Sequence, residues 1–339
     1  MIETLSLPPY FHPTTVCLVD DNESFLRSLS LEIPENLAFR GFTDPQVALD
    51  LVNRKLSLPP LVDRCFSMEH RSDQDPVIHL DLSTIEQEIN HRERFERISV
   101  VLVDYAMPSV DGLQFCAGVR DPYIRKAMLT GVADEKLAVE AFNAGLIHRF
   151  IPKHTATAID KLLSFIEELQ QMYFGQYTAR LQNALAIDPP GFLVDPAIAS
   201  RVKQLIAEHQ LVEYYLVNDP PGFLMLRADG TVVRLVLLDD RERQQQLDLA
   251  RRHHAPESIV TGLASGTLLA LLSGDSPADY FGSEPFPWSD SVAAAEKIQS
   301  AQKGARTWHL ALFQDPATDI DFDPARCCYN AYLETLDSQ

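Results

Sequence analysis

The chain has 339 residues and a formal net charge of −19, from 48 Asp and Glu residues against 29 Lys and Arg residues. This length suggests two domains, since single domains commonly have about 100–200 residues. Residues 1–169 hold 26 acidic and 16 basic residues, and residues 170–339 hold 22 and 13. Both halves are acidic, whereas a DNA-binding module usually presents a net basic face, so the composition gives no support for DNA binding.

The apolar stretches and the cysteines of the sequence indicate the cellular compartment of the protein. The longest apolar stretch, near 267–272, is far shorter than the ~20 residues needed to span a bilayer. The N-terminal residues lack the basic segment and the continuous apolar core of a secretory signal. The five cysteines are scattered, and the pair Cys327-Cys328 has neither the spacing of a redox motif nor a nearby histidine cluster. We therefore expect a cytoplasmic protein with no membrane association.

Short apolar runs alternate with amphipathic segments through the first half of the chain. The runs predict strands over residues 15–19, 38–42, 98–103, 126–130 and 148–151. One of the intervening helices is expected over 22–31, and another starts at Thr43-Asp44-Pro45, where proline suits the first helical position. Strands that alternate with helices form βαβ units, so the sequence predicts an α/β domain with a doubly wound, five-stranded parallel sheet.

Residues 55–97 separate the second helix from the third strand of this sheet. The connection is much longer than the ~2–6 residues usual in α/β units. A helix is expected over 83–97, where Ile85, Ile89 and Phe95 could face a core. We interpret 55–97 as an insertion with its own structure.

Residues 155–186 predict one long connecting helix with apolar residues at three- and four-residue spacing. This spacing is compatible with a coiled-coil seam. The alternative is a terminal helix that packs on the sheet of its own domain and is followed by a linker. The sequence does not decide between the two.

Residues 187–339 predict a second, α+β domain. The hexapeptide Asp-Pro-Pro-Gly-Phe-Leu occurs at 188–193 and again at 219–224, and Pro-Gly suits the centre of a turn. The second copy and Asp229-Gly230 separate three apolar runs, which predicts a three-stranded antiparallel meander. After the meander we expect helices over 239–254, 256–272 and 291–303 and a strand over 307–313.

Five polar residues each stand at the carboxyl end of a predicted parallel strand: Asp20, Asp21, Asp104, Thr130 and Lys153. In an open α/β sheet these ends meet at one crevice, where ligands bind. Clustered carboxylates repel one another unless a cation lies among them, and oxygen ligands suit Mg²⁺. A lysine and a threonine hydroxyl nearby suit an anionic group. The set fits phosphoryl transfer, in which an aspartate carboxylate can be the nucleophile.

The motifs around these residues resemble the two-component response regulators and their receiver domain. They are Asp20-Asp21, the D-x-x-M-P-x-x-D-G pattern of 104–112, Thr130-Gly131, 141–145 (AFNAG) and 150–153 (FIPK). The resemblance covers about residues 14–170 apart from the insertion. It implies a flavodoxin-like receiver domain over 14–154, with 155–186 as a connecting helix and 187–339 as an output domain.

The resemblance also implies roles for individual residues. Asp104 would be the phosphoacceptor, and Asp20, Asp21, Asp104 and the backbone carbonyl of Ala106 would bind Mg²⁺. Thr130 would contact the phosphoryl group, Lys153 would pair with it, and Phe150 would be an aromatic switch. The phosphoryl donor would be a phosphohistidine on a sensor histidine kinase or a phosphotransfer protein. Receivers carry a proline directly after this lysine, whereas this chain has His154.

The output domain matches no signature of a basic helix-turn-helix or of a cyclic-dinucleotide enzyme. The first hypothesis is a signalling protein whose only chemistry is that of a phosphoacceptor with autophosphatase activity, and which acts through dimerisation or protein contacts. The second makes the output domain an enzyme or nucleotide-binding module gated by the receiver. The third is a phosphorylation-independent interaction scaffold.

Overall fold

The structure is a computed structural model, and it describes residues 5–69, 77–108, 110–131, 135–153, 158–186, 189–272, 286–300, 306–316 and 322–337. Its contacts divide the chain into two compact units, each built from three separate segments. The parallel-sheet unit consists of Pro13–Pro59, His91–Ala179 and Tyr329–Gln339. The antiparallel-sheet unit consists of Met1–His12, Pro60–Asn90 and Arg180–Cys328. The predicted division into 14–154, 155–186 and 187–339 differs from these units, because the chain passes between them several times.

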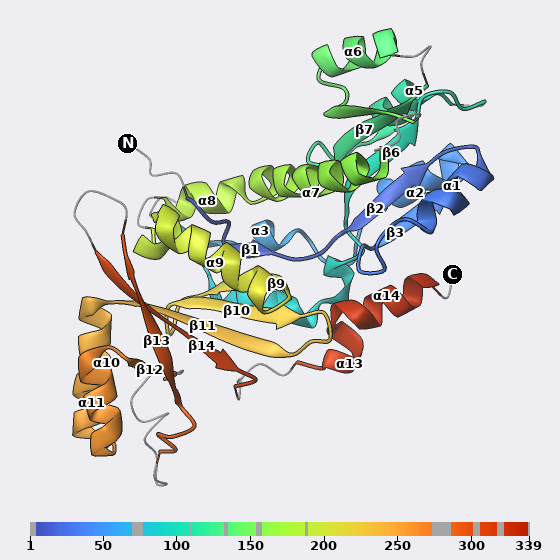
Figure 1. Cartoon of the computed structure of the whole chain (residues 1–339). Helices are drawn as coiled ribbons and strands as arrows, with labels where there is room; N and C mark the ends of the chain where they lie inside the picture. The colour runs from blue at the N-terminus through green and yellow to red at the C-terminus, as the bar shows by residue number, and fades with distance from the viewer. Residues whose placement is uncertain are drawn as a thin grey trace. The chain divides into compact units, whose positions relative to one another are not determined.

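The parallel-sheet unit has the predicted α/β fold (Figure 1). Its strands are parallel and lie in the order β3-β2-β6-β7-β8. They are β2 Thr15–Val19, β3 Phe39–Phe42, β6 Ile98–Asp104, β7 Arg125–Thr130 and β8 Arg149–Pro152. Every residue of β2 and β6 is buried, as expected for inner strands that are covered on both faces. The five-stranded, doubly wound sheet is therefore confirmed.

Helices form an apolar core on each face of this sheet. α2, α5 and α6 contribute to one core, and α1 and α7 contribute to the other. The bounds are α1 Glu23–Ser30, α2 Pro45–Val52, α5 Gly112–Gly118, α6 Glu135–Asn143 and α7 Ala158–Tyr177. The Asn22 and Asp44 side chains cap α1 and α2 by accepting hydrogen bonds from backbone N–H groups of the first turn. Pro45 is the first residue of α2, as predicted.

The single helix predicted over 155–186 is wrong, because the structure has two helices there. α7 ends at Tyr177, and α8 (Ala179–Leu185) lies almost wholly in the antiparallel-sheet unit. Leu162, Ile166 and Leu169 of α7 are buried in the core of the parallel sheet. α7 is therefore a terminal helix packed on its own sheet, as in the alternative that the sequence left open, but the helix α8 follows it where that alternative has a linker.

The C-terminal helix α14 (Tyr329–Asp337) belongs to the parallel-sheet unit, although strands of the other unit precede it in the chain. The Tyr329 hydroxyl accepts a hydrogen bond from Ala38 N (2.8 Å) and donates one to Asn36 O (3.0 Å). The Tyr332 hydroxyl lies 2.6 Å from Thr15 Oγ1. These contacts tie α14 to the beginnings of β3 and β2, at the amino ends of the strands.

The antiparallel-sheet unit contains a seven-stranded sheet in the order β1-β9-β10-β11-β14-β13-β12. Its strands are β1 Tyr10–Phe11, β9 Leu211–Val217, β10 Gly222–Arg227, β11 Val232–Asp239, β12 Leu268–Ala270, β13 Val292–Gln299 and β14 Thr307–Gln314. Strands β9, β10 and β11 form the predicted meander, and β14 confirms the late strand. The larger helices of this unit are α9 Pro196–Glu208, α10 Asp240–Arg252 and α11 Glu257–Ser265.

Two helix predictions in this unit are wrong. The segment 291–303 contains the strand β13, in which Ala295 pairs with Ala311 of β14. Its alanines favour a helix by propensity, but pairing between strands overrides propensity. The helix predicted over 256–272 ends at Ser265, because Gly266 takes a left-handed conformation (φ 73°) and β12 follows.

The insertion has its own structure, as expected. Most of it, Pro60–Asn90, belongs by its contacts to the antiparallel-sheet unit, whereas 55–59 and 91–97 belong to the parallel-sheet unit. It contains α3 Leu61–Arg64, the hairpin β4 Phe66–Glu69 and β5 Val77–Leu80, and α4 Ser83–Glu86. The helix predicted over 83–97 is wrong: α4 is followed by two short 3₁₀ turns, Gln87–Asn90 and Arg92–Arg94. The ion pair between Arg64 and Glu88 joins the two ends of the insertion.

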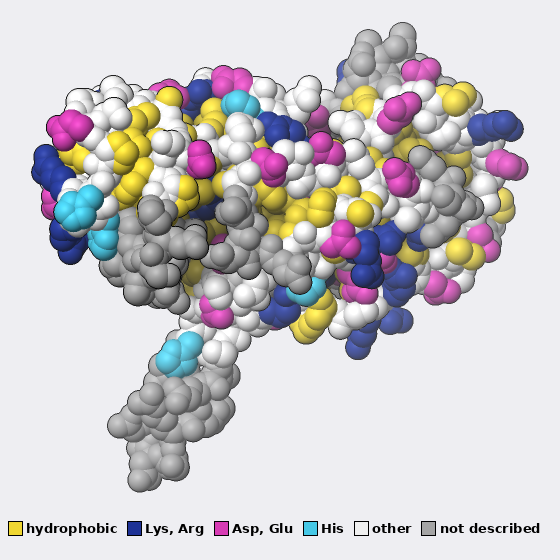
Figure 2. All heavy atoms as spheres, turned by 90° about the horizontal axis from the view of Figure 1, so that it is seen from below, with side chains coloured by type: hydrophobic (Ala, Val, Ile, Leu, Met, Phe, Trp, Pro, Cys, Tyr) yellow, Lys and Arg dark blue, Asp and Glu magenta, His cyan; other side chains and the backbone are white. Residues whose placement is uncertain are grey.

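In the described part of the chain, no helix combines the length and the apolar content that a bilayer crossing requires. On the face shown in Figure 2, Lys and Arg side chains lie among Asp and Glu side chains rather than in one continuous basic surface.

Candidate functional site

Three carboxylates meet at the carboxyl edge of the parallel sheet. Asp20 and Asp21 follow β2, and Asp104 is the last residue of the neighbouring strand β6. One oxygen atom of each lies within 4.8 Å of an oxygen atom of the other two. Asp20 and Asp104 are buried and Asp21 is exposed. A cluster of carboxylate oxygens, open on one side, is a donor set that fits Mg²⁺, which keeps several water ligands.

Lys153, directly after β8, lies against the two buried carboxylates. Its Nζ atom is 2.6 Å from Asp20 Oδ2 and 2.9 Å from Asp104 Oδ1. Its backbone N–H donates a hydrogen bond to Thr130 O (3.0 Å), which fixes the start of the loop after the strand. One ammonium group therefore bridges side chains from two strands of the sheet.

Burial and charge act in opposite directions on the pKa values of this site. Burial raises the pKa of Asp20 above its ordinary value, although hydrogen bonds from the Lys153 ammonium and the Asn22 N–H act against this. Burial disfavours the charged form of Lys153, but hydrogen bonds to Asp20 and Asp104 outweigh it and raise the pKa of the lysine. Lys153 is thus held in its cationic form.

Thr130, at the end of β7, is fully buried, and its hydroxyl has no hydrogen-bond partner among the residues that the structure describes. A buried hydroxyl without a partner costs about 1–3 kcal/mol. Such a group is ready to donate to an anionic ligand, so the residues fit a phosphoryl group as well as a cation.

The loop after Asp104 is fixed by the start of α5. Gly112 N donates a hydrogen bond to Tyr105 O (3.0 Å), and Asp111 caps the helix with Gln114 in a capping box. A Cβ atom on Gly112 would lie 2.5 Å from the backbone oxygen of Asp104, so only glycine fits there. This packing explains the D-G pair of the motif. It sets the path of the chain through Ala106, an exposed residue beside the carboxylates.

Phe150 lies on β8 and is half-buried, and its register partner on β7 is Met128. Its ring makes an edge-to-face contact with Phe142 of α6, with ring centroids 6.5 Å apart. α6 also exposes Leu137 and Val139, and Phe142 is itself 42% exposed. Phe150 therefore connects the strand beside Thr130 to an exposed apolar surface. His154 lies outside the described residues.

Sequence reasoning missed Phe25 as a site residue. We expected it only as an apolar residue of the first helix, yet the Lys153 Nζ atom lies 4.7 Å from the centre of its ring. The available signal was its position in the first turn after Asp20-Asp21. Hydrophobic spacing alone could not distinguish that role from core packing.

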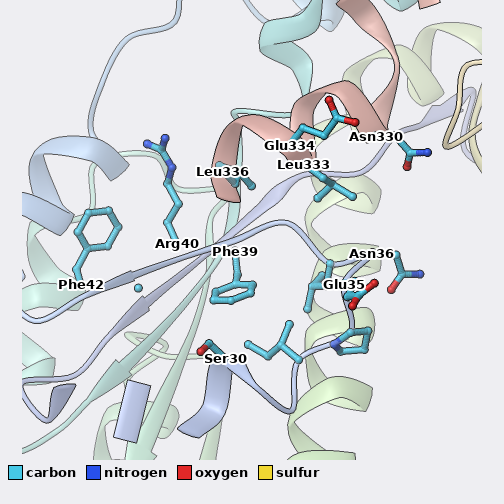
Figure 3. A pocket seen from close by; sticks show the side chains of 14 residues that line it. Ser30, Glu35, Asn36, Phe39, Arg40, Phe42, Asn330, Leu333, Glu334 and Leu336 are labelled. Atoms are coloured by element: carbon cyan, nitrogen blue, oxygen red, sulfur yellow. The ribbon is translucent and has the colours of Figure 1, made fainter. Parts of the chain in front are cut away.

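A groove of about 1110 Å³ lies elsewhere in the same unit (Figure 3). It is lined by the loop before β3, by β3 itself and by α14, including Ile33, Phe39 and Leu333. It shares no residue with the carboxylate cluster, so the chemistry of the site does not extend into it.

Comparisons with known proteins agree with this geometry. No family model and no curated protein matches the chain. Among solved structures, the Legionella pneumophila response regulator LqsR is 32% identical, with 99% of this chain and 98% of that chain covered and a TM-score of 0.76. A CheY-like receiver domain protein from Methanospirillum hungatei JF-1 is 17% identical over 48% of this chain and 98% of its own (TM-score 0.32). Full-length FixJ from B. japonicum is 19% identical over 58% and 76% (TM-score 0.34). From its likeness to LqsR over both units, the chain belongs to the response regulators of two-component signalling.

Proposed function

We propose that this response regulator accepts a phosphoryl group on Asp104. The donor is a phosphohistidine on a sensor histidine kinase or on a phosphotransfer protein, in the cytoplasm. One observation carries the proposal: Lys153 bridges Asp20 and Asp104 at the sheet edge where the buried Thr130 hydroxyl lacks a partner. The five cysteines are all free thiols, which supports a reducing compartment.

The residues divide the chemistry of the transfer between them. A carboxylate oxygen of Asp104 attacks phosphorus, the P–N bond to the donor histidine breaks, and its electron pair returns to the imidazole. Lys153 neutralises one phosphoryl oxygen, and the Thr130 hydroxyl donates a hydrogen bond to another. Asp20, Asp21, Asp104 and the carbonyl of Ala106 would hold Mg²⁺, which neutralises charge on the carboxylates and the phosphoryl oxygens.

The signal leaves the site through β7, β8 and α6. Phosphorylation adds a charge of roughly −2 and gives the Thr130 hydroxyl a partner. A shift of Thr130 changes the space beside Phe150, whose ring touches Phe142 of α6. The exposed side chains of Val139 and Phe142, three residues apart on one face of α6, then form part of a homodimer surface. Apolar residues exposed together on one helix are suited to such contacts.

The antiparallel-sheet unit acts, in this proposal, through protein contacts rather than catalysis. Two of its buried polar groups hold the fold: Arg234 donates hydrogen bonds to backbone carbonyls, and Asp195 caps α9 and accepts a hydrogen bond from Trp308 Nε1 (3.0 Å). A nucleotide-dependent rise in the melting temperature of the full chain that persists in Asp104→Asn would favour an enzymatic or nucleotide-binding output instead.

Incubation of the chain with Mg²⁺ and phosphoramidate, followed by intact-mass spectrometry, tests the proposal. One added phosphoryl group is expected on the wild type and none on Asp104→Asn. Light scattering with and without beryllofluoride, a mimic of the phosphoryl group, tests the output step. A rise in mass that Asp104→Asn lacks supports dimerisation. If Asp104 is phosphorylated but the mass measured by light scattering does not rise, phosphorylation is supported and dimerisation is contradicted. No labelling favours the interaction scaffold.

A further inference from the structure

The corner between β2 and α1 places a ring and a carboxylate around one ammonium group. The Lys153 Nζ atom lies 2.6 Å from Asp20 Oδ2 and 4.7 Å from the centre of the Phe25 ring. Its side chain is only 17% exposed, so water screens these contacts little. A cation above the face of an aromatic ring is attracted by the negative face of the π system, and more strongly where water is excluded.

The ring and the carboxylate belong to one hydrogen-bonded turn. Asn22 N donates to Asp20 Oδ1 (3.0 Å), and the Asn22 side chain accepts from Phe25 N (3.1 Å). Phe25 is partly buried in the core on the α1 and α7 face of the sheet, which restricts its rotamers. The turn therefore presents the Asp20 carboxylate and the Phe25 ring to Lys153 as one preformed surface.

We infer that Phe25 is a positioning residue that holds the Lys153 ammonium group at the phosphoryl-acceptor site. Lysine has a flexible stem, and its strongest contacts in this structure are two carboxylates. In the proposed function, those carboxylates also bind the cation and the phosphoryl group. A ring attracts the ammonium without using a carboxylate oxygen, so this contact persists when the carboxylates engage other ligands. The inference rests on the proposed function and goes beyond it by giving Phe25 a role in that site.

Substitution at Phe25 separates this role from core packing. Phe25→Leu keeps an apolar side chain but removes the ring, and Phe25→Tyr keeps the ring. Phe165→Leu is the matched control, because Phe165 is another partly buried phenylalanine packed against the same core. The full chain is used throughout, with Mg²⁺ and beryllofluoride as the ligand and with the melting temperature measured for each variant.

We expect Phe25→Leu to weaken beryllofluoride binding by about 3- to 10-fold, the range of one partly desolvated cation–π contact. Phe25→Tyr should bind within about twofold of the wild type, and so should Phe165→Leu, even though both leucine variants lose melting temperature. Equal binding by Phe25→Leu and wild type overturns the inference. An equal loss in Phe165→Leu, or no rescue by Phe25→Tyr, also overturns it, because the effect would then be one of packing.

A second measurement needs neither Mg²⁺ nor beryllofluoride. A ring above the lysine shifts the resonances of the Lys153 Cε protons upfield, and this shift should be present in the wild type and Phe25→Tyr but absent in Phe25→Leu. If the wild type lacks the shift, the inference fails. If the wild type shows the shift and yet binds no beryllofluoride, the contact stands as structure, and the proposed phosphoryl transfer fails together with the positioning role.

Discussion

The two sheets of this protein use buried charge in opposite ways. In the parallel-sheet unit, Asp20, Asp104 and Lys153 have one another as partners and lie at a single edge. In the antiparallel-sheet unit, Arg234 is 5% exposed, and its guanidinium donates hydrogen bonds to backbone carbonyls, such as that of Leu235 at 2.7 Å. The first arrangement leaves charged groups available to a ligand, and the second uses them to hold the chain.

The difference follows from strand direction. Parallel strands all end at the same edge, so residues far apart in sequence meet there, as Asp20 and Lys153 do. Antiparallel strands end alternately at opposite edges, so the polar residues at their ends do not gather at one edge. Arg234 instead bonds to its neighbour Leu235 and to Phe223 on the adjacent strand. Buried charged side chains thus meet at one sheet edge in the first unit, whereas Arg234 holds neighbouring backbone in the second.

The sharpest test of this contrast is Asp104→Asn. We expect beryllofluoride binding to disappear, because the carboxylate that we propose as the phosphoryl acceptor is replaced by a neutral carboxamide. The free energy of unfolding should change by less than about 1 kcal/mol, since the substitution also removes repulsion from Asp20. Calorimetry gives both quantities. A large loss of stability would mean that this carboxylate is part of the architecture, as Arg234 is.

Deletion of residues 329–339 tests whether α14 belongs to the parallel sheet. Tyr329 and Tyr332 are 2% and 3% exposed, and each is also hydrogen-bonded, so we expect a loss of more than about 4 kcal/mol in that unit. Hydrogen exchange should show faster exchange in β2 and β3 than in β9 to β11. Equal protection of β2 and β3 in the full chain and the shortened chain would contradict the assignment.

Arg234→Met is the counterpart of Asp104→Asn in the other sheet. Methionine fills similar space but leaves the carbonyls of Pro220, Phe223 and Leu235 without their donor. We expect the free energy of unfolding to fall by about 2 kcal/mol, as measured by urea denaturation. Beryllofluoride binding should stay within about twofold of the wild type, because Arg234 is not among the residues of the carboxylate site. A tenfold loss of binding would break the contrast between the sheets.

The pH dependence of Mg²⁺ binding gives the smallest expected effect. Burial raises the pKa of Asp20, so protons compete with Mg²⁺ at a higher pH than at an ordinary aspartate. The affinity should fall as the pH falls through that raised pKa, by up to about tenfold per pH unit. The native state there binds a proton more readily than the unfolded state, so the same fall in pH makes Asp20 less destabilising. Titrations with Asp20→Asn should remove this part of the profile.

The sequence was sufficient to predict the secondary structure where the local residue pattern and the tertiary fold favour the same element. The five strands of the parallel sheet, the helix start at Asp44-Pro45 and the meander that begins at Leu211 all match their sequence patterns. The meeting of Asp20 with Lys153 was also predictable, because parallel strands bring their carboxyl ends together. The functional roles of these residues stay predictions.

Sequence failed where tertiary contacts decide. The alanines of β13 become a strand only because β14 offers a partner. No local feature of α14 predicts the hydrogen bond between the Tyr332 hydroxyl and Thr15 Oγ1, which joins residues from opposite ends of the chain. The position of Phe25 beside Lys153 likewise depends on α1 and the end of β8, which are distant in sequence. Hydrophobic spacing shows which residues are buried but not which side chain they touch.

The order of segments in the two units has a consequence for how this protein is made and how it diverges. The parallel-sheet unit is completed by α14, which follows every strand of the antiparallel sheet in the chain. During synthesis the parallel-sheet unit therefore cannot be completed before the antiparallel-sheet unit has been made, whereas successive domains of other proteins fold one after the other. A recombination event that exchanges one contiguous stretch would also break both units. An exchange of the contiguous stretch 13–179, for example, would carry Pro60–Asn90 of the antiparallel-sheet unit with it and leave Tyr329–Gln339 of the parallel-sheet unit behind.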